Sequence, residues 1–161
     1  MKLTNDSIFP RNLRADWSPD RKKIVFARAL QAAENNENVY VMNADGSAVS
    51  PLTFDHLGNN APKWSRDGKR IVFQSNRDGN DEIYVMDADG GYQTRLTFRD
   101  SSDANPVWSP DGQKIVFHSG TQNDFQLYIM NADGTGVTQV TSLPTSSFFP
   151  ELGRGHVRPP E

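Results

Sequence analysis

The sequence predicts an all-β fold, a β-propeller of four-stranded antiparallel blades, with three full blades in this chain. Two observations carry this prediction. One pattern of about 45 residues occurs three times in the chain, which is the period of a propeller blade. Its apolar segments are short, rich in β-branched and aromatic residues, and bounded by turn residues, which favours strands over helices.

Each copy ends its first segment at a tryptophan that precedes a tight turn. The copies read WSPDR from Trp17, WSRDG from Trp64 and WSPDG from Trp108. Asp in such a turn bonds nearby backbone, and Gly after it takes a positive φ without steric cost. Arg21 stands where the other copies have this glycine. A positive φ at Arg21 would therefore cost about 1 kcal/mol.

The second and third segments of each copy are apolar without alternation. The second reads IVF in all copies, and the third reads VYVM, IYVM or LYIM. A strand with one wet face would alternate, whereas a strand buried on both faces need not. We therefore expect each sheet to be sandwiched between neighbours. The strands expected in the middle copy are 62–65, 70–75, 82–87 and 92–97.

The repeats define the domain organisation. Propeller repeats are expected over 1–155, with blades at about 13–53, 61–97 and 105–141 and a partial blade end on either side. Leu3-Thr4 matches the last segment of a blade, and 148–155 matches the start of a fourth copy. Residues 156–161, with two prolines and no strand pattern, are expected to form a loose tail.

Three blades leave two apolar end faces, which need a cover. One interpretation is a longer propeller of which this chain is a piece, without independent function. The other is self-association, in which a homodimer of three blades each closes a six-bladed ring.

Composition argues against several partners. The net charge of −3 gives no electrostatic case for nucleic acid. Apolar runs stay far below the roughly 18 residues of a membrane span, so we expect no membrane insertion. The start, MKLTNDSIFPRNL, lacks the apolar core of a signal peptide, and the chain has no cysteine.

Candidate binding residues lie where the copies differ. The linker from each Leu-Thr to the next tryptophan varies freely, and in a propeller it leads to the next innermost strand at one mouth of the channel. Loops on a rigid scaffold are common binding sites. The candidates are Arg14, Asn59, Asn60, Asp103 and Asn105, with Asn12, Phe148 and Phe149 as further contributors. A solvated linker without a ligand is the alternative.

Residues that recur in every copy are interpreted as structural. Asp20, Asp67 and Asp111 could form an acidic ring, but their place beside a turn favours a turn role. The tryptophans, together with Tyr40, Tyr84 and Tyr128, could form a binding face, but inter-blade core fits their apolar setting better.

Metal binding and catalysis find little support. The stretch 87–90, DADG, resembles the opening of a calcium loop, so calcium is possible, but no later ligands follow and a hairpin turn explains it. There is no G-x-S-x-G elbow, and the three histidines fall at non-equivalent positions. We therefore expect no catalytic residue, metal or cofactor.

The pattern W-S-P-D-G-x-x-I-V-F, then I-Y-V-M-(N/D)-A-D-G, then L-T resembles the propeller repeat of the TolB family over about 1–155. The resemblance implies a binding scaffold for a protein, a peptide or a small polar ligand at the channel mouth, often in the periplasm or cell envelope of bacteria. The same repeat occurs in the substrate-filtering propellers of prolyl-oligopeptidase-like and tricorn-type peptidases, which is the enzyme-class alternative. A glycosidase-type or lactonase-type propeller is a weaker one.

Overall fold

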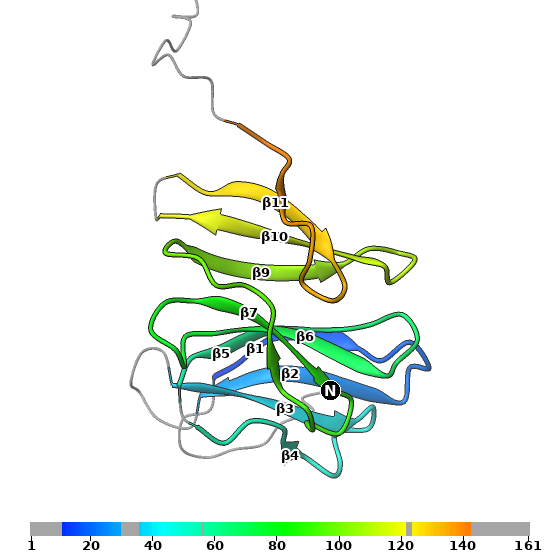
Figure 1. Cartoon of the computed structure of the whole chain (residues 1–161). Coiled ribbons are helices and arrows are strands. Elements are labelled where there is room, and N and C mark those ends of the chain that lie inside the picture. The colour runs from blue at the N-terminus through cyan, green and yellow to red at the C-terminus, as the bar shows by residue number, and fades with distance from the viewer. Residues whose placement is uncertain (1–10, 30–35, 56, 122–123, 143–161) are drawn as a thin grey trace, which may run out of the picture.

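The structure, a computed structural model, describes residues 11–29, 36–55, 57–121 and 124–142. It consists of three four-stranded antiparallel sheets stacked as successive blades, a partial all-β propeller as the sequence predicts (Figure 1). The described residues form no helix, and so include none long and apolar enough to span a membrane.

Within each blade the strands follow chain order. The first blade contains β1 (Arg11–Trp17), β2 (Lys23–Ala29), β3 (Glu37–Asn43) and β4 (Ser50–Pro51). The second contains β5 (Asn59–Trp64), β6 (Arg70–Ser75), β7 (Glu82–Asp87) and β8 (Thr94–Arg95). The third contains β9 (Ser102–Trp108), β10 (Lys114–Gly120), β11 (Gln126–Asn131) and β12 (Thr138–Gln139).

The expected middle strands 70–75 and 82–87 are confirmed, whereas the edge strands differ from the prediction. The first strand of the middle blade begins at Asn59 and not at 62, and the last is only Thr94–Arg95 and not 92–97. The apolar pattern locates the central strands because they are buried. The edge strands carry mixed side chains, so their limits depend on pairing that no local pattern records.

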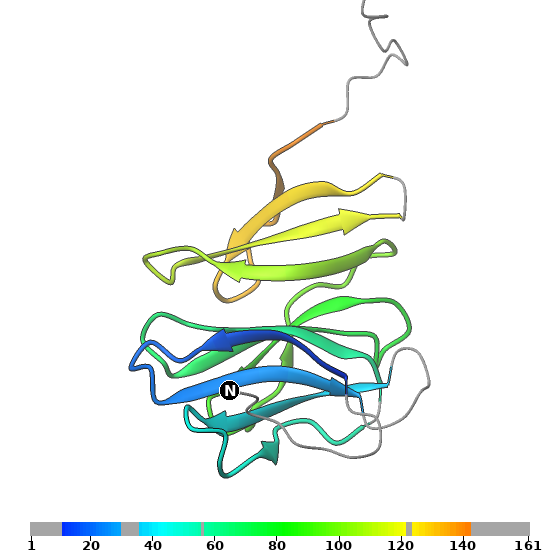
Figure 2. The ribbon, with the colours of Figure 1, turned by 180° about the vertical axis from the view of Figure 1, so that it is seen from behind.

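The first strand of each blade lies innermost. β5 contacts β1, β2 and β3 of the first blade, and β9 contacts β5, β6 and β7 of the second. The short strands β4, β8 and β12 contact only the strand before them within the described part of the chain. The three first strands therefore face the axis, and Figure 2 shows the stack of blades from behind.

Two apolar clusters fill the spaces between blades. Each blade has a leading face toward the preceding blade and a trailing face toward the next one. The first cluster joins the trailing face of the first blade, Val25, Val39, Val41 and Leu52, to the leading face of the second, Trp64, Ile71, Phe73, Tyr84 and Met86. The second cluster repeats this arrangement between the second and third blades. Burial on both faces explains why the central strands do not alternate.

The turns after the tryptophans are closed by their aspartates. The Ser65 hydroxyl donates to Asp67 Oδ1 at 2.6 Å, and the Lys69 N–H donates to the same oxygen at 3.1 Å. These bonds hold the pKa of the Asp67 carboxyl below its usual value, with the serine bond as the largest cause. Asp20 and Asp111 repeat the arrangement, so the turn role of all three is confirmed.

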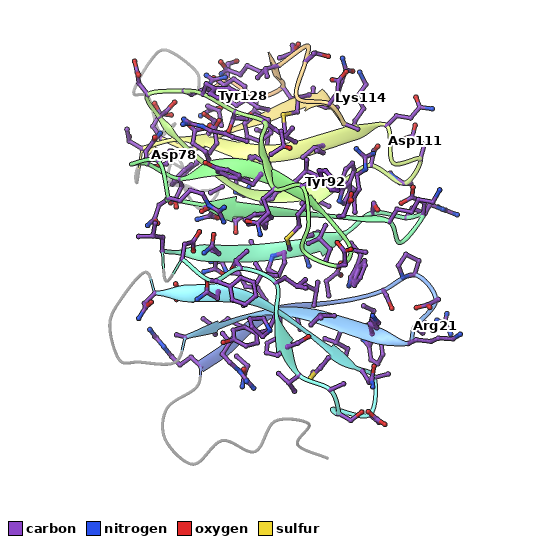
Figure 3. The ribbon with its side chains drawn as sticks, turned by 60° about the horizontal axis from the view of Figure 1, so that its bottom comes forward. Arg21, Asp78, Tyr92, Asp111, Lys114 and Tyr128 are labelled. Carbon is purple, nitrogen blue, oxygen red and sulfur yellow. The ribbon has the colours of Figure 1, made fainter. Side chains whose placement is uncertain are left out.

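Arg21 adopts the positive φ that its place in the repeat requires. Its φ is 61°, against 70° at Gly68 and 71° at Gly112. The repeat thus imposes its turn on a residue that does not favour it, at a cost of about 1 kcal/mol. In Figure 3, Arg21 and Asp111 lie at one end of the blades and Asp78 at the other, so the post-tryptophan turns of the first and third blades lie at the same end.

One recurring aromatic residue is not in the core. Trp64 and Trp108 are buried between blades, but Trp17 is 54% exposed. The expectation that all three tryptophans form inter-blade core is wrong for Trp17, because no described residue packs on it from a preceding blade.

Candidate functional site

The candidate residues fall in innermost strands and not in loops. Arg14 lies in β1, Asn59 and Asn60 lie in β5, and Asp103 and Asn105 lie in β9. The linker assignment is therefore wrong for these residues, since the strands begin earlier than the apolar pattern indicates. Phe148 and Phe149 lie outside the described residues.

A bulge interrupts all three innermost strands at the same point. The register with the second strand shifts between Leu13 and Asp16 in the first blade, and between Asn60 and Lys63 in the second. The third blade shifts at the corresponding place. The bulged residues Arg14, Ala61 and Asn105 have φ of 52°, 49° and 52°. The backbone conformation at the bulge is thus the same in all three repeats, whereas the side chain at this position differs in each blade.

The side chains of Arg14 and Asn105 contact each other between the innermost strands of the first and third blades. Nη1 of Arg14 donates a hydrogen bond to Oδ1 of Asn105, which joins the first blade to the third past Ala61 of the second. A cleft of about 290 Å³, here called the axial cleft, lies beside them. Its lining residues are Arg14, Ala61, Lys63, Asn105, Pro106 and Val107.

Second-blade residues support the Asn105 end of the cleft. The N–H of Asn105 donates to Oε1 of Gln74 at 3.2 Å. The side chain of Gln74 also forms a hydrogen bond with the carboxyl of Asp81, and the pKa of Asp81 is raised above its usual value. Burial is the largest cause, Glu82 acts in the same direction, and Gln74 and Arg14 oppose it. A polar chain therefore runs from Arg14 through Asn105 and Gln74 to Asp81.

Asn59 is structural. It is fully buried, and its Nδ2 donates to Asp55 Oδ1 at 2.5 Å and to Leu57 O at 2.6 Å. Its Oδ1 accepts a bond from Arg77 Nη2 at 2.8 Å, and Arg77 pairs with Asp55 at 3.0 Å. The amide thus fixes the linker between the first two blades and has no face toward a ligand.

Asp103 occupies the position of Asn59 in the next blade and is also fully buried. Its N–H donates to Asp81 O at 2.7 Å, while neither carboxylate oxygen has a hydrogen-bond partner among the described residues. Arg99 Nε lies 4.0 Å from Oδ1. Burial raises the pKa of the Asp103 carboxyl, and the Glu82 carboxylate raises it further, while Ser119, Thr97 and Arg99 act against them. Asp103 is thus buried and does not line the axial cleft.

Asn60 is half-buried and lies one residue before the bulge. Its Oδ1 accepts the N–H of Ala61 at 2.8 Å, which stabilises the positive φ there. Asn60 is therefore a support of the cleft wall. Of the five predicted site residues, only Arg14 and Asn105 line the axial cleft.

Sequence reasoning missed Lys63, Gln74 and Asp81. Lys63 lines the cleft, and its Nζ lies 3.6 Å from Asp16 Oδ1. The signal that could have found it is the variation of the copies beside the tryptophan, where Asp16, Lys63 and Val107 stand at one repeat position.

The DADG stretch forms a turn. Asp89 Oδ1 accepts the N–H of Gly91 at 2.9 Å, and the N–H of Gly90 donates to Asp87 O at 2.9 Å. The turn therefore explains the stretch without a metal. Within the described ranges, no three or more His, Cys, Asp and Glu side chains form a group able to hold a metal. His118 contacts the Phe125 ring, while His56 and His156 lie outside those ranges.

Known proteins share the repeat sequence and the fold of this chain. Residues 7–151 match the model of the TolB beta propeller domain family. A structure assigned as TolB from Agrobacterium tumefaciens superposes with a TM-score of 0.70 and 29% identity, over 80% of this chain and 50% of that one. The chain therefore spans half the length of that relative.

Peptidases also carry similar repeats. A 65-residue stretch is 37% identical to dipeptidyl-peptidase 5 of Porphyromonas gingivalis, covering 38% of this chain and 10% of that protein. A puromycin-hydrolyzing peptidase of Mycobacterium tuberculosis shares the fold, with a TM-score of 0.68 and 15% identity, over 86% of this chain and 23% of that one.

Proposed function

This chain belongs to the TolB beta propeller domain family, and from that premise we propose that it is a non-catalytic module that binds a peptide or an extended segment of a partner protein at the axial cleft. The observation that carries the proposal is the hydrogen bond between Arg14 and Asn105, which joins side chains of two different blades beside a cleft.

Two features support a binding role for these residues. Each bulge holds a non-glycine residue at positive φ, a strained conformation that the surrounding sheet fixes. The side chains at the bulges nevertheless differ between blades, whereas the residues of the post-tryptophan turns and of the central strands recur. A rigid backbone with variable side chains is the arrangement by which one fold serves many ligands.

A peptide library tests this proposal. The chain is immobilised and panned against random heptapeptides displayed on phage, and recovered peptides are measured by calorimetry. We expect Arg14→Ala with Asn105→Ala to weaken binding about ten-fold or more, since charged and polar hydrogen bonds are lost. Lys69→Ala, which removes a cation from an exposed turn, is the control and keeps wild-type affinity. Equal affinity of the double variant would refute binding at the axial cleft.

The second candidate is that this chain is the substrate-filtering propeller of a peptidase. The 37% identity to a stretch of dipeptidyl-peptidase 5 favours it. The reading frame that encodes the chain separates the two candidates. A hydrolase domain in the same frame supports the peptidase, and further propeller repeats without one support the binding module.

We also propose that copies of the chain associate through their exposed end faces. On the third blade, Val140 is 60% exposed and Val116, Leu127 and Ile129 are half-buried. Their counterparts Val72, Ile83, Val85 and Leu96 are buried against the next blade. Sedimentation should give twice the 18.0 kDa chain mass, and Leu127→Glu should give the monomer. A folded wild-type monomer at high concentration would exclude this association.

A further inference from the structure

The side chains around the axial cleft have an uneven charge. Two are cations, Arg14 and Lys63, one is the amide of Asn105, and none of the lining residues is an acid. The remaining lining residues, Ala61, Pro106 and Val107, are apolar. We infer, resting on the proposed binding function, that the axial cleft recognises a peptide carboxylate that carries a neighbouring aliphatic side chain.

Arg14 is the group placed to hold the carboxylate. A guanidinium has five N–H donors in a planar fork that matches the two oxygens of a carboxylate. One nitrogen of Arg14 is held by Asn105 Oδ1, and the described part of the chain supplies no other hydrogen bond to this guanidinium. The bond to Asn105 fixes the orientation of the fork, which lowers the entropy lost on binding. The other donors stay available to an anion.

Lys63 adds charge without competing for the same contact. Its Nζ is 3.6 Å from Asp16, so this pair is close to neutral, and Asp16 also accepts the N–H of Trp64 at 2.9 Å. The positive charge that remains at the cleft is therefore that of Arg14, which the carboxyl of Asp81 offsets in part. A ligand with one negative charge suits it better than a polyanion.

The apolar lining residues favour a ligand that has an aliphatic group next to its carboxylate. Val107 is 51% exposed beside the buried Pro106, so an aliphatic group of a ligand can cover it. Ala61 stands where the other two blades have Arg14 and Asn105. Because the side chain of Ala61 is only a methyl group, it leaves the space between Arg14 and Asn105 open, and this space forms the cleft.

Nuclear magnetic resonance titration tests the inference with four probes. They are N-acetyl-Ala-Val with a free carboxylate, the same dipeptide as its C-terminal amide, N-acetyl-Asp-Val amide with a side-chain carboxylate, and inorganic phosphate. We expect the free acid to shift the Arg14 Nε–H and the backbone amides of 104–107, and the C-terminal amide to bind about ten-fold more weakly. The Asp-containing probe shows whether a side-chain carboxylate serves as well as a terminal one.

Three variants accompany the probes. Arg14→Gln should weaken binding of the free acid about ten-fold, and Ala61→Asn should weaken it by filling the cleft. Asn adopts positive φ more readily than Ala, which offsets part of the cost of a larger side chain at the buried Ala61, and the urea midpoint of Ala61→Asn is measured beside its affinity. Lys69→Gln removes an exposed cation that does not line the cleft and should leave the affinity unchanged.

The outcomes separate this inference from the proposed function. If the C-terminal amide binds as well as the acid and shifts the same residues, the carboxylate inference is wrong while peptide binding at the cleft stands. If phosphate binds as tightly as the acid, the cleft is a general anion site and the inference is also wrong. If no peptide shifts residues of the axial cleft, both proposals fall.

Discussion

The second and third blades have nearly the same central sequence and very different burial. Strand β7 contains IYVM and β11 contains LYIM, yet residues 83–86 are all buried while 127–129 are only half-buried. The second blade has a neighbour on each face, and the third has a described neighbour on one face only. Burial in this fold is therefore supplied by the next blade, and equal residues at equal repeat positions differ in what they contribute to stability.

The largest contrast is expected for the apolar residue that opens the third segment. Ile83→Ala should lower the free energy of unfolding by about 3 kcal/mol, because Ile83 is fully buried and leaves a cavity. Leu127→Ala at the equivalent position should cost about 1 kcal/mol in dilute protein, where copies of the chain are dissociated and this side chain is half-exposed. Urea unfolding followed by tryptophan fluorescence measures both. Equal losses would show that the trailing face of the third blade is covered as well.

The threonine that follows the last strand of each blade sharpens the comparison. Thr97 donates to Glu82 and accepts the N–H of Ile83 at 2.9 Å in a buried site. Thr141 makes the same pair of bonds with Gln126 and Leu127 in an exposed one. Thr97→Val should cost about 2 kcal/mol, because buried groups lose their partners, and Thr141→Val about 0.5 kcal/mol because water replaces the hydroxyl. A larger loss from Thr141→Val, read from the urea midpoints, would contradict this account.

Asp103 gives a smaller effect with a defined pH dependence. Its pKa is raised in the folded state above the value of 3.8, so its contribution to stability is full at pH below 3.8 and is lost as pH rises through the raised pKa. Asp103→Asn should therefore stabilise the chain by about 1 kcal/mol at neutral pH and by less in acid.

Unfolding of the wild type and of Asp103→Asn between pH 3 and 8 tests this prediction. The difference between the two chains isolates Asp103 from Asp81, whose pKa is also raised. A difference that stays constant over the whole range would show that Asp103 keeps an ordinary pKa.

The sequence predicts the blades well because their signals are local. Pairs of apolar central strands, the Ser–Asp turns and the positive φ of Arg21 all follow from residues close together in the chain. The axial cleft could be predicted only in part. Variation among copies marked Arg14 and Asn105, but it also marked Asn59 and Asp103, which are buried. Separating them needs the bulge, which rotates the following side chains and which no local pattern reports.

One paired measurement tests the central claim, that buried side chains of the innermost strands hold the fold while side chains at the bulges bind. Peptide affinity and urea midpoint are determined for Asn59→Ala and for Asn105→Ala. Asn59→Ala should lose about 2 kcal/mol of stability and, where folded, keep wild-type affinity, because its amide is buried in the linker network. Asn105→Ala should lose affinity and at most about 1 kcal/mol of stability, because Ala adopts the positive φ of this position less readily than Asn. The account is contradicted if Asn105→Ala loses as much stability as Asn59→Ala while its folded form binds as the wild type does.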